Sequence, residues 1–164
     1  MEAGPRFVRL AAALLAALAI FGAPTVARDA ELDINGPAEF VASMEDGLDA
    51  LQSIGLRAYV TTQIGTLSAD LEPTCTTFTG PQAGQPCLTR TDRPPDNYGR
   101  ATVHLRWPHP VWASPTETAA YLAHEATHVY RYHQDQYTWA DEAAPTSVEF
   151  VVRWALRSRQ QQLE

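Results

Sequence analysis

Apolar positions recur at helical spacing over residues 34–56. The recurring side chains are Phe40, Val41, Met44, Leu48, Leu51 and Ile54. Spacing of three and four residues places such side chains on one face of an α-helix. Asn35 can cap this helix, Pro37 lies just inside its predicted start, and Gly55 predicts its end. We therefore predict a helix here that packs on a core through one face.

Two other segments alternate apolar and polar positions instead. The first is RAYVTTQIG, residues 57–65, and the second is RATVHLRW, residues 100–107. In the second segment Val103, Leu105 and Trp107 would lie on one face. A period of two, with β-branched and aromatic side chains, is typical of a β-strand. We predict a strand in both places.

The best-specified helix covers residues 114–133. Ser114 is a suitable N-cap, Pro115 takes the first helical position, and Glu117 follows three residues after the cap. Together they form the pattern of a capping box. A further helix is predicted over residues 140–160.

The N-terminal residues are typical of a secretory signal. Two arginines precede an unbroken run of small and apolar residues at 11–23, and small residues follow at Thr25 and Ala27. The run is too short for a bilayer span, which needs about 20 residues. We therefore predict a signal peptide at 1–27 and a single domain at 28–164. The expected location is secreted or periplasmic, with no stable membrane span after cleavage.

The long segment from residue 73 to residue 99 has no hydrophobic period. It is rich in Pro, Gly, Thr and Asp, so we predict a loop. It contains both cysteines of the chain, Cys75 and Cys87. An even count in an exported protein predicts a disulfide, which would add roughly 3 kcal/mol of stability across so short a loop.

The net charge of the chain limits the kinds of partner that it can bind. The formal net charge is −7, and the chain contains no lysine, so arginine carries all the positive charge. An acidic surface argues against nucleic acid and against anionic membrane surfaces as partners.

Residues 124–128, HEATH, form a possible metal-binding motif. His124 and His128 are four residues apart and therefore share one helix face. Two imidazoles so placed can both reach one metal ion, about 2 Å from each nitrogen. Glu125 is placed to hold a water on that metal rather than to bind the metal itself. Zinc would acidify the water, and the carboxylate would accept its proton.

A catalytic zinc needs a third protein ligand and an open fourth position. Glu142 is the first candidate. Glu149 is another, either as the ligand or as a residue that orients a zinc-bound histidine. Asp141 is an alternative ligand or an N-cap. His133 is also a candidate, although five residues along a helix from His128 turns its ring away from the metal face.

With Glu142 followed by alanine on the next helix, residues 100–157 resemble the gluzincin core of small exported bacterial metallopeptidases. The resemblance implies a minimal zincin-like α+β domain in which both motif histidines and Glu142 bind Zn²⁺ and Glu125 is the general base. It also implies that the strand before the motif helix is an edge strand. A peptide or protein substrate would then pair with residues 102–105.

Other interpretations stay open at this point. A zinc-bearing scaffold could bind a peptide or envelope component without cutting it. A metal-free domain could hold His124 and His128 as core residues. Several side chains are candidates for stabilising an oxyanion beside the metal: His104, His109, Tyr130, Arg131, His133 and Tyr137.

Overall fold

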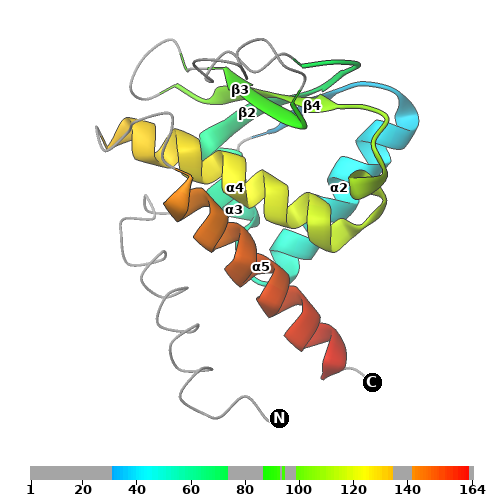
Figure 1. Ribbon diagram of the computed structural model, residues 1–164, viewed down its shortest axis with the longest axis vertical. Coiled ribbons are helices and arrows are strands. Elements are labelled where there is room, and N and C mark those ends of the chain that lie inside the picture. The colour runs from blue at the N-terminus through cyan, green and yellow to red at the C-terminus, as the bar shows by residue number, and fades with distance from the viewer. Residues whose placement is uncertain (1–30, 74–86, 93, 95–98, 135–141, 163–164) are drawn as a thin grey trace.

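The computed structural model describes residues 31–73, 87–92, 94, 99–134 and 142–162 (Figure 1). The expected α+β fold is confirmed. The elements of the described chain are β1 (Asp33–Asn35), α2 (Ala38–Ser53), α3 (Arg57–Gln63), β2 (Ile64–Asp70), β3 (Thr89–Asp92), β4 (Ala101–Arg106), the 3-10 turn η1 (Pro110–Ala113), α4 (Pro115–His133) and α5 (Ala143–Gln161). The signal peptide predicted at 1–27 lies outside the described residues.

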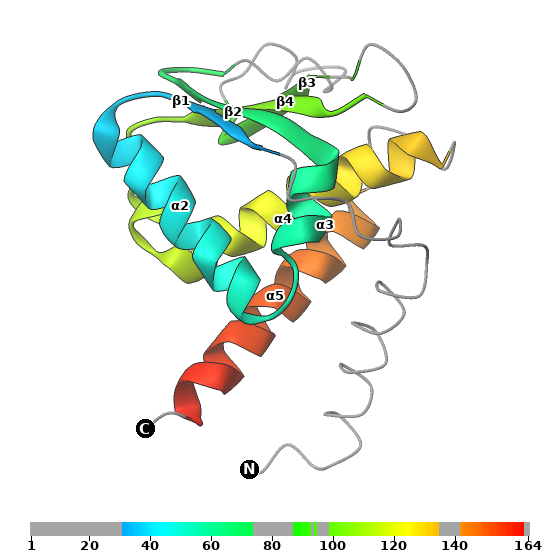
Figure 2. The same cartoon turned by 180° about the vertical axis from the view of Figure 1, so that it is seen from behind.

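The sheet is mixed, with strand order β1-β2-β4-β3. β2 pairs in parallel with β1 and with β4, whereas β3 pairs antiparallel with β4. β4 is therefore an interior strand, and the prediction of an edge strand before the motif helix is wrong. Residues 102–105 pair with β2 on one side and β3 on the other, so they cannot accept a substrate strand. The edge strand on that side is β3 (Figure 2).

The prediction of a loop throughout 73–99 is also wrong, because β3 lies within it. The four residues of β3, Thr-Arg-Thr-Asp, are polar on both faces, so they carry no hydrophobic alternation. Pairing with β4 defines this strand: Thr89 lies opposite Leu105 and Asp92 lies opposite Thr102.

The prediction of a strand at residues 57–65 is wrong for most of its length. Residues 57–63 form α3, and β2 begins only at Ile64. Leu56, Val60 and Ile64 are all buried. Leu56, at the N-cap, and Val60 are one helical turn apart on the buried side of α3, and this burial outweighs the strand propensity of the β-branched residues in the segment.

Three expected helices are present, and two of them, α2 and α5, begin later than predicted. The cap predicted at Asn35 is wrong: Asn35 belongs to β1 and its side chain donates to Asp33, while Pro37 takes the N-cap position of α2. Gly55 has a φ of 77°, a left-handed conformation that ends the segment after α2. At the start of α4, Ser114 accepts a hydrogen bond from the Glu117 N–H, as predicted.

The core lies between the sheet and the helices, with α4 at its centre (Figures 1 and 2). α4 contacts α2, α3 and α5. Four of its ten buried residues are alanine: Ala119, Ala120, Ala123 and Ala126. Such small side chains let neighbouring helices approach closely, and Gly47 of α2 does the same from the other side. A Cβ at Gly47 would lie 2.5 Å from Cγ2 of Thr118.

Two further expectations concern the export of the protein. Cys75 lies outside the described residues, so its disulfide with Cys87 stays a prediction. The Cys87 N–H donates to the Pro73 carbonyl at 2.9 Å, which brings the two ends of the intervening segment together. Among the described residues, no helix combines the length and the hydropathy needed to cross a membrane.

Candidate metal centre

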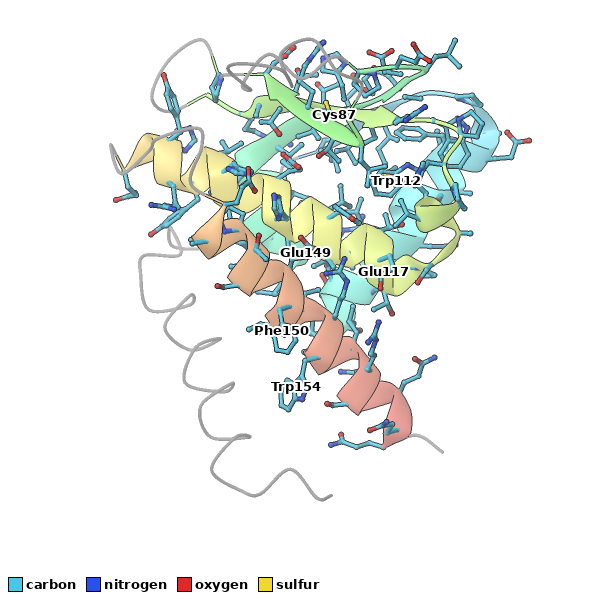
Figure 3. All side chains as sticks on the ribbon, viewed as in Figure 1. Cys87, Trp112, Glu117, Glu149, Phe150 and Trp154 are labelled. Atoms are coloured by element: carbon cyan, nitrogen blue, oxygen red, sulfur yellow. The ribbon has the colours of Figure 1, made fainter. Side chains whose placement is uncertain are left out.

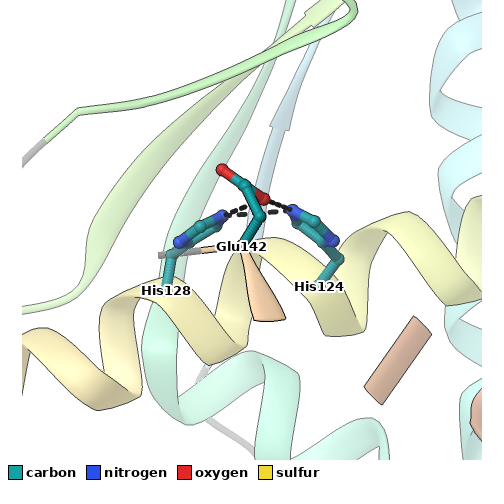
Figure 4. Close-up of side chains that lie close together, drawn as sticks. All are labelled: His124, His128 and Glu142. Atoms are coloured by element: carbon teal, nitrogen blue, oxygen red, sulfur yellow. Dashed lines mark hydrogen bonds and ion pairs between the residues drawn. The ribbon is translucent and has the colours of Figure 1, made fainter. Parts of the chain in front are cut away.

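α4 and the start of α5 bring three of the predicted site residues together (Figure 4). His124 and His128 lie one turn apart on α4, and Glu142 occupies the N-cap position of α5. Glu142 makes no capping hydrogen bond with its side chain. Its carboxylate lies against the two histidines instead, and the candidate ligand atoms of all three residues are within 4.8 Å of one another.

The distances between these atoms fit one bound cation. Oε2 of Glu142 is 3.1 Å from Nε2 of His124 and 3.4 Å from Nε2 of His128. The two Nε2 atoms are 3.1 Å apart. Ligand bonds of about 2.0–2.1 Å at a tetrahedral ion place donor atoms about 3.3 Å from each other. The three side chains are therefore already arranged as one face of such a coordination shell.

The electrostatics of the group also favour a cation. Nδ1 of His124 is 2.9 Å from Oε2 of Glu149, so a proton on Nδ1 is donated to that carboxylate. Nε2, the other ring nitrogen of His124, faces Glu142 and His128. Burial lowers the pKa of His128 below its ordinary value, although Glu125, chief among the opposing charges, raises it. Neutral imidazole is the form that binds a metal.

Glu149 lies behind His124 rather than beside Glu142. Arg153 forms ion pairs with Glu149 and with Glu117, the latter at 2.7 Å. This chain of charges runs from the candidate metal centre to the first turn of α4 (Figure 3). Of the two roles expected for Glu149, the geometry favours orientation of a ligand histidine.

Glu125 projects from α4 toward β3. Its side chain is buried, and both carboxylate oxygens accept hydrogen bonds from that strand. Thr89 Oγ1 donates to Oε1 at 2.6 Å, and Thr91 Oγ1 donates to Oε2 at 2.5 Å. Neither threonine was predicted from the sequence to lie at the site. Their alternation in Thr-Arg-Thr-Asp was the available signal, but nothing local indicates which helix such a strand faces.

The remaining candidates are engaged elsewhere or lie outside the described residues. Nε2 of His133 is 3.0 Å from the Gly99 carbonyl. Nε2 of His104 is 3.0 Å from Asp92, on the face of β4 opposite the buried one. Nδ1 of His109 accepts from the Val111 N–H. Tyr130 packs at a tilt against Tyr59, and Arg131 lies in the last turn of α4. Asp141 and Tyr137 are among the residues not described.

No protein-family model, curated protein or solved structure matches this chain. The chemistry of the site is therefore inferred from its residues alone. They define a candidate metal centre of two histidines and one glutamate on an α+β fold.

Proposed function

We propose that this protein is an exported zinc metallopeptidase of the gluzincin type. The observation that carries the proposal is the convergence of His124, His128 and Glu142 on one point, with Glu125 adjacent on α4. Two imidazole nitrogens and one carboxylate oxygen form a ligand set that suits zinc and leaves a fourth position open.

Bound zinc would supply a Lewis acid that polarises a peptide carbonyl and acidifies water. The residues of the chain do the rest. Glu125 accepts the proton of the attacking water and passes it to the leaving amine. Glu149 holds the Nδ1 proton of His124, which keeps the opposite nitrogen available as a ligand.

The proposed substrate is an extended peptide that pairs with β3. Among the described strands β3 pairs with β4 alone, which leaves its outer edge for a further strand. Backbone hydrogen bonds to such an edge bind a peptide with little dependence on its side chains. The site of action would be outside the cytoplasm, since the N-terminal residues are typical of an export signal.

A second candidate function is a zinc-bearing module that binds a peptide or envelope component without cutting it. One observation favours it: both carboxylate oxygens of Glu125 already accept hydrogen bonds from β3. This function predicts bound zinc and no cleavage.

The first test is zinc per molecule in the chain from residue 28 to 164, measured by mass spectrometry of the metal. Glu142→Ala should clearly lower the zinc content, while Glu39→Ala, an exposed glutamate of α2, serves as the matched control. Absence of zinc from the parent protein, even after incubation with the metal, would rule out both candidate functions.

The second test separates the two functions. A peptide library incubated with the zinc-loaded protein should yield defined cleavage products, and Glu125→Gln should abolish them while it retains zinc. Cleavage that persists undiminished in Glu125→Gln would contradict the role of Glu125. Bound zinc without any cleavage would favour the binding module.

A further inference from the structure

β3 pairs with β4 in the sheet, and two of its side chains also contact α4. Thr89 and Thr91 are two residues apart and therefore point to the same side of the strand. Each donates its hydroxyl to a different oxygen of the Glu125 carboxylate, at 2.6 and 2.5 Å. The two hydroxyls therefore hydrogen-bond both oxygens of the carboxylate. We call Thr89, Thr91 and the Glu125 carboxylate together the threonine clamp.

The strand that carries the clamp is itself well anchored. Thr89 lies opposite Leu105 and Thr91 lies opposite Val103, and both partners on β4 are completely buried. The Arg106 N–H also donates to the Leu88 carbonyl at 2.8 Å, one residue before the strand. Threonine adds rigidity of its own because its branched Cβ restricts χ1. The hydroxyls are therefore held in place by a fixed strand.

The clamp matches what a general base requires. Glu125 is 5% exposed, so its charged form has lost most of its hydration, and two hydroxyl donors replace part of it. Bonds to both oxygens also stop rotation of the terminal carboxylate, which is otherwise the loosest torsion of the side chain. Each oxygen has a second lone pair, so the carboxylate can still accept a proton from water.

We infer that Thr89 and Thr91 are positioning residues that fix the Glu125 carboxylate for proton transfer. β3 thereby links the general base to the edge at which the substrate is proposed to bind. The catalytic part of this inference rests on the proposed peptidase function, whereas the clamp itself is a contact that can be tested without any substrate.

The contact is tested by a double-mutant cycle on the melting temperature of the metal-free protein. Thr89→Val/Thr91→Val removes both donors with little change in shape. In the Glu125 background it should lower Tm by about 5 °C, the shift expected when a buried carboxylate loses two hydrogen bonds. In a Glu125→Met background, where no carboxylate remains, the same pair of changes should leave Tm unchanged or raise it. Equal shifts in both backgrounds would overturn the clamp.

The positioning role is tested on the zinc-loaded protein with a library peptide that it cuts. Thr89→Val/Thr91→Val should lower kcat about 10–100-fold, the scale of a misplaced catalytic group, with KM and zinc content nearly unchanged. Thr89→Ser/Thr91→Ser keeps both hydroxyls and should restore most of kcat. Thr102→Val, on the opposite face of β4, is the matched control and should leave kcat unaltered.

The outcomes distinguish this inference from the proposed function. Coupling in the cycle with kcat within twofold of the parent would overturn the positioning role and leave the clamp as a structural contact. Zinc binding without cleavage by the parent protein would overturn the peptidase function and the catalytic part of the inference together. The melting cycle would still decide whether the threonines hold Glu125.

Discussion

At the scale of single residues, the candidate metal centre has a carboxylate, Glu149, that contacts His124 on the ring nitrogen that faces away from His128 and Glu142. Glu149 lies 2.9 Å from Nδ1 of His124 and is only partly exposed. A carboxylate in this position fixes both the orientation of the ring and the nitrogen that carries the proton.

Glu149→Ala should therefore weaken zinc affinity about 10–100-fold without removing any of the three ligands. Competition with a chromophoric chelator measures the dissociation constant, and circular dichroism checks that α5 is retained. Thr146→Ala, an exposed neighbour on the same helix, is the control. An affinity equal to that of the parent protein would show that Glu149 does not support His124. An affinity as low as that of Glu142→Ala would instead make Glu149 a ligand.

The part of the site that could be predicted from sequence is the part that local geometry determines. His124, Glu125 and His128 lie on one helix, whose period fixes their relative directions. Glu142 follows His133, the last residue of α4, by nine positions, and so short a stretch of sequence limits where it can lie. Thr89 and Thr91 come from a distant strand, and only tertiary packing brings that strand to Glu125.

At the scale of elements, local sequence also determines the helices that were predicted, whereas tertiary packing determines the segments that were not. α4 begins with Ser114 and Pro115, whose capping geometry is encoded within four residues. α3 carries β-branched residues that suggest a strand, and its helical form depends on burial of Val60 against other elements. β3 has no apolar period at all and forms because β4 offers an edge.

The contact between α2 and α4 gives a prediction at this scale. Gly47→Ala would place a Cβ 2.5 Å from Cγ2 of Thr118 and 3.3 Å from the Ala119 amide nitrogen. The helices must then move apart or distort, at a cost of about 1–3 kcal/mol of unfolding free energy. Urea denaturation followed by circular dichroism measures the loss.

Combining Gly47→Ala with Thr118→Ser removes the closest clashing atom and keeps a hydroxyl for the Trp112 carbonyl. The double variant should recover part of the lost stability. No recovery would mean that the atoms kept in the double variant, Cβ of residue 118 at 2.8 Å and the Ala119 amide nitrogen at 3.3 Å, limit the approach. Stability unchanged in Gly47→Ala alone would contradict the close packing of the two helices.

At the scale of the whole molecule, the candidate metal centre connects two helices that the core also joins. His124 and His128 belong to the central helix α4, while Glu142 stands at the start of α5. A metal held by all three would bind the folded chain and not the unfolded one, because the ligands come together only on folding. Binding of this kind stabilises the fold by an amount set by concentration and affinity.

Zinc should therefore raise the thermal midpoint of the protein, by the equivalent of about 2.7 kcal/mol when free zinc is 100 times its dissociation constant. Differential scanning calorimetry with zinc and then with a chelator in excess measures the shift and its reversal. His128→Ala should lose the zinc-dependent part of the shift, and the threonine variants at 89 and 91 should keep it, since they leave the ligands intact. A midpoint that rises equally in His128→Ala would show that zinc acts elsewhere on the chain. A midpoint that zinc leaves unchanged in the parent protein would mean that the three side chains meet without holding the ion.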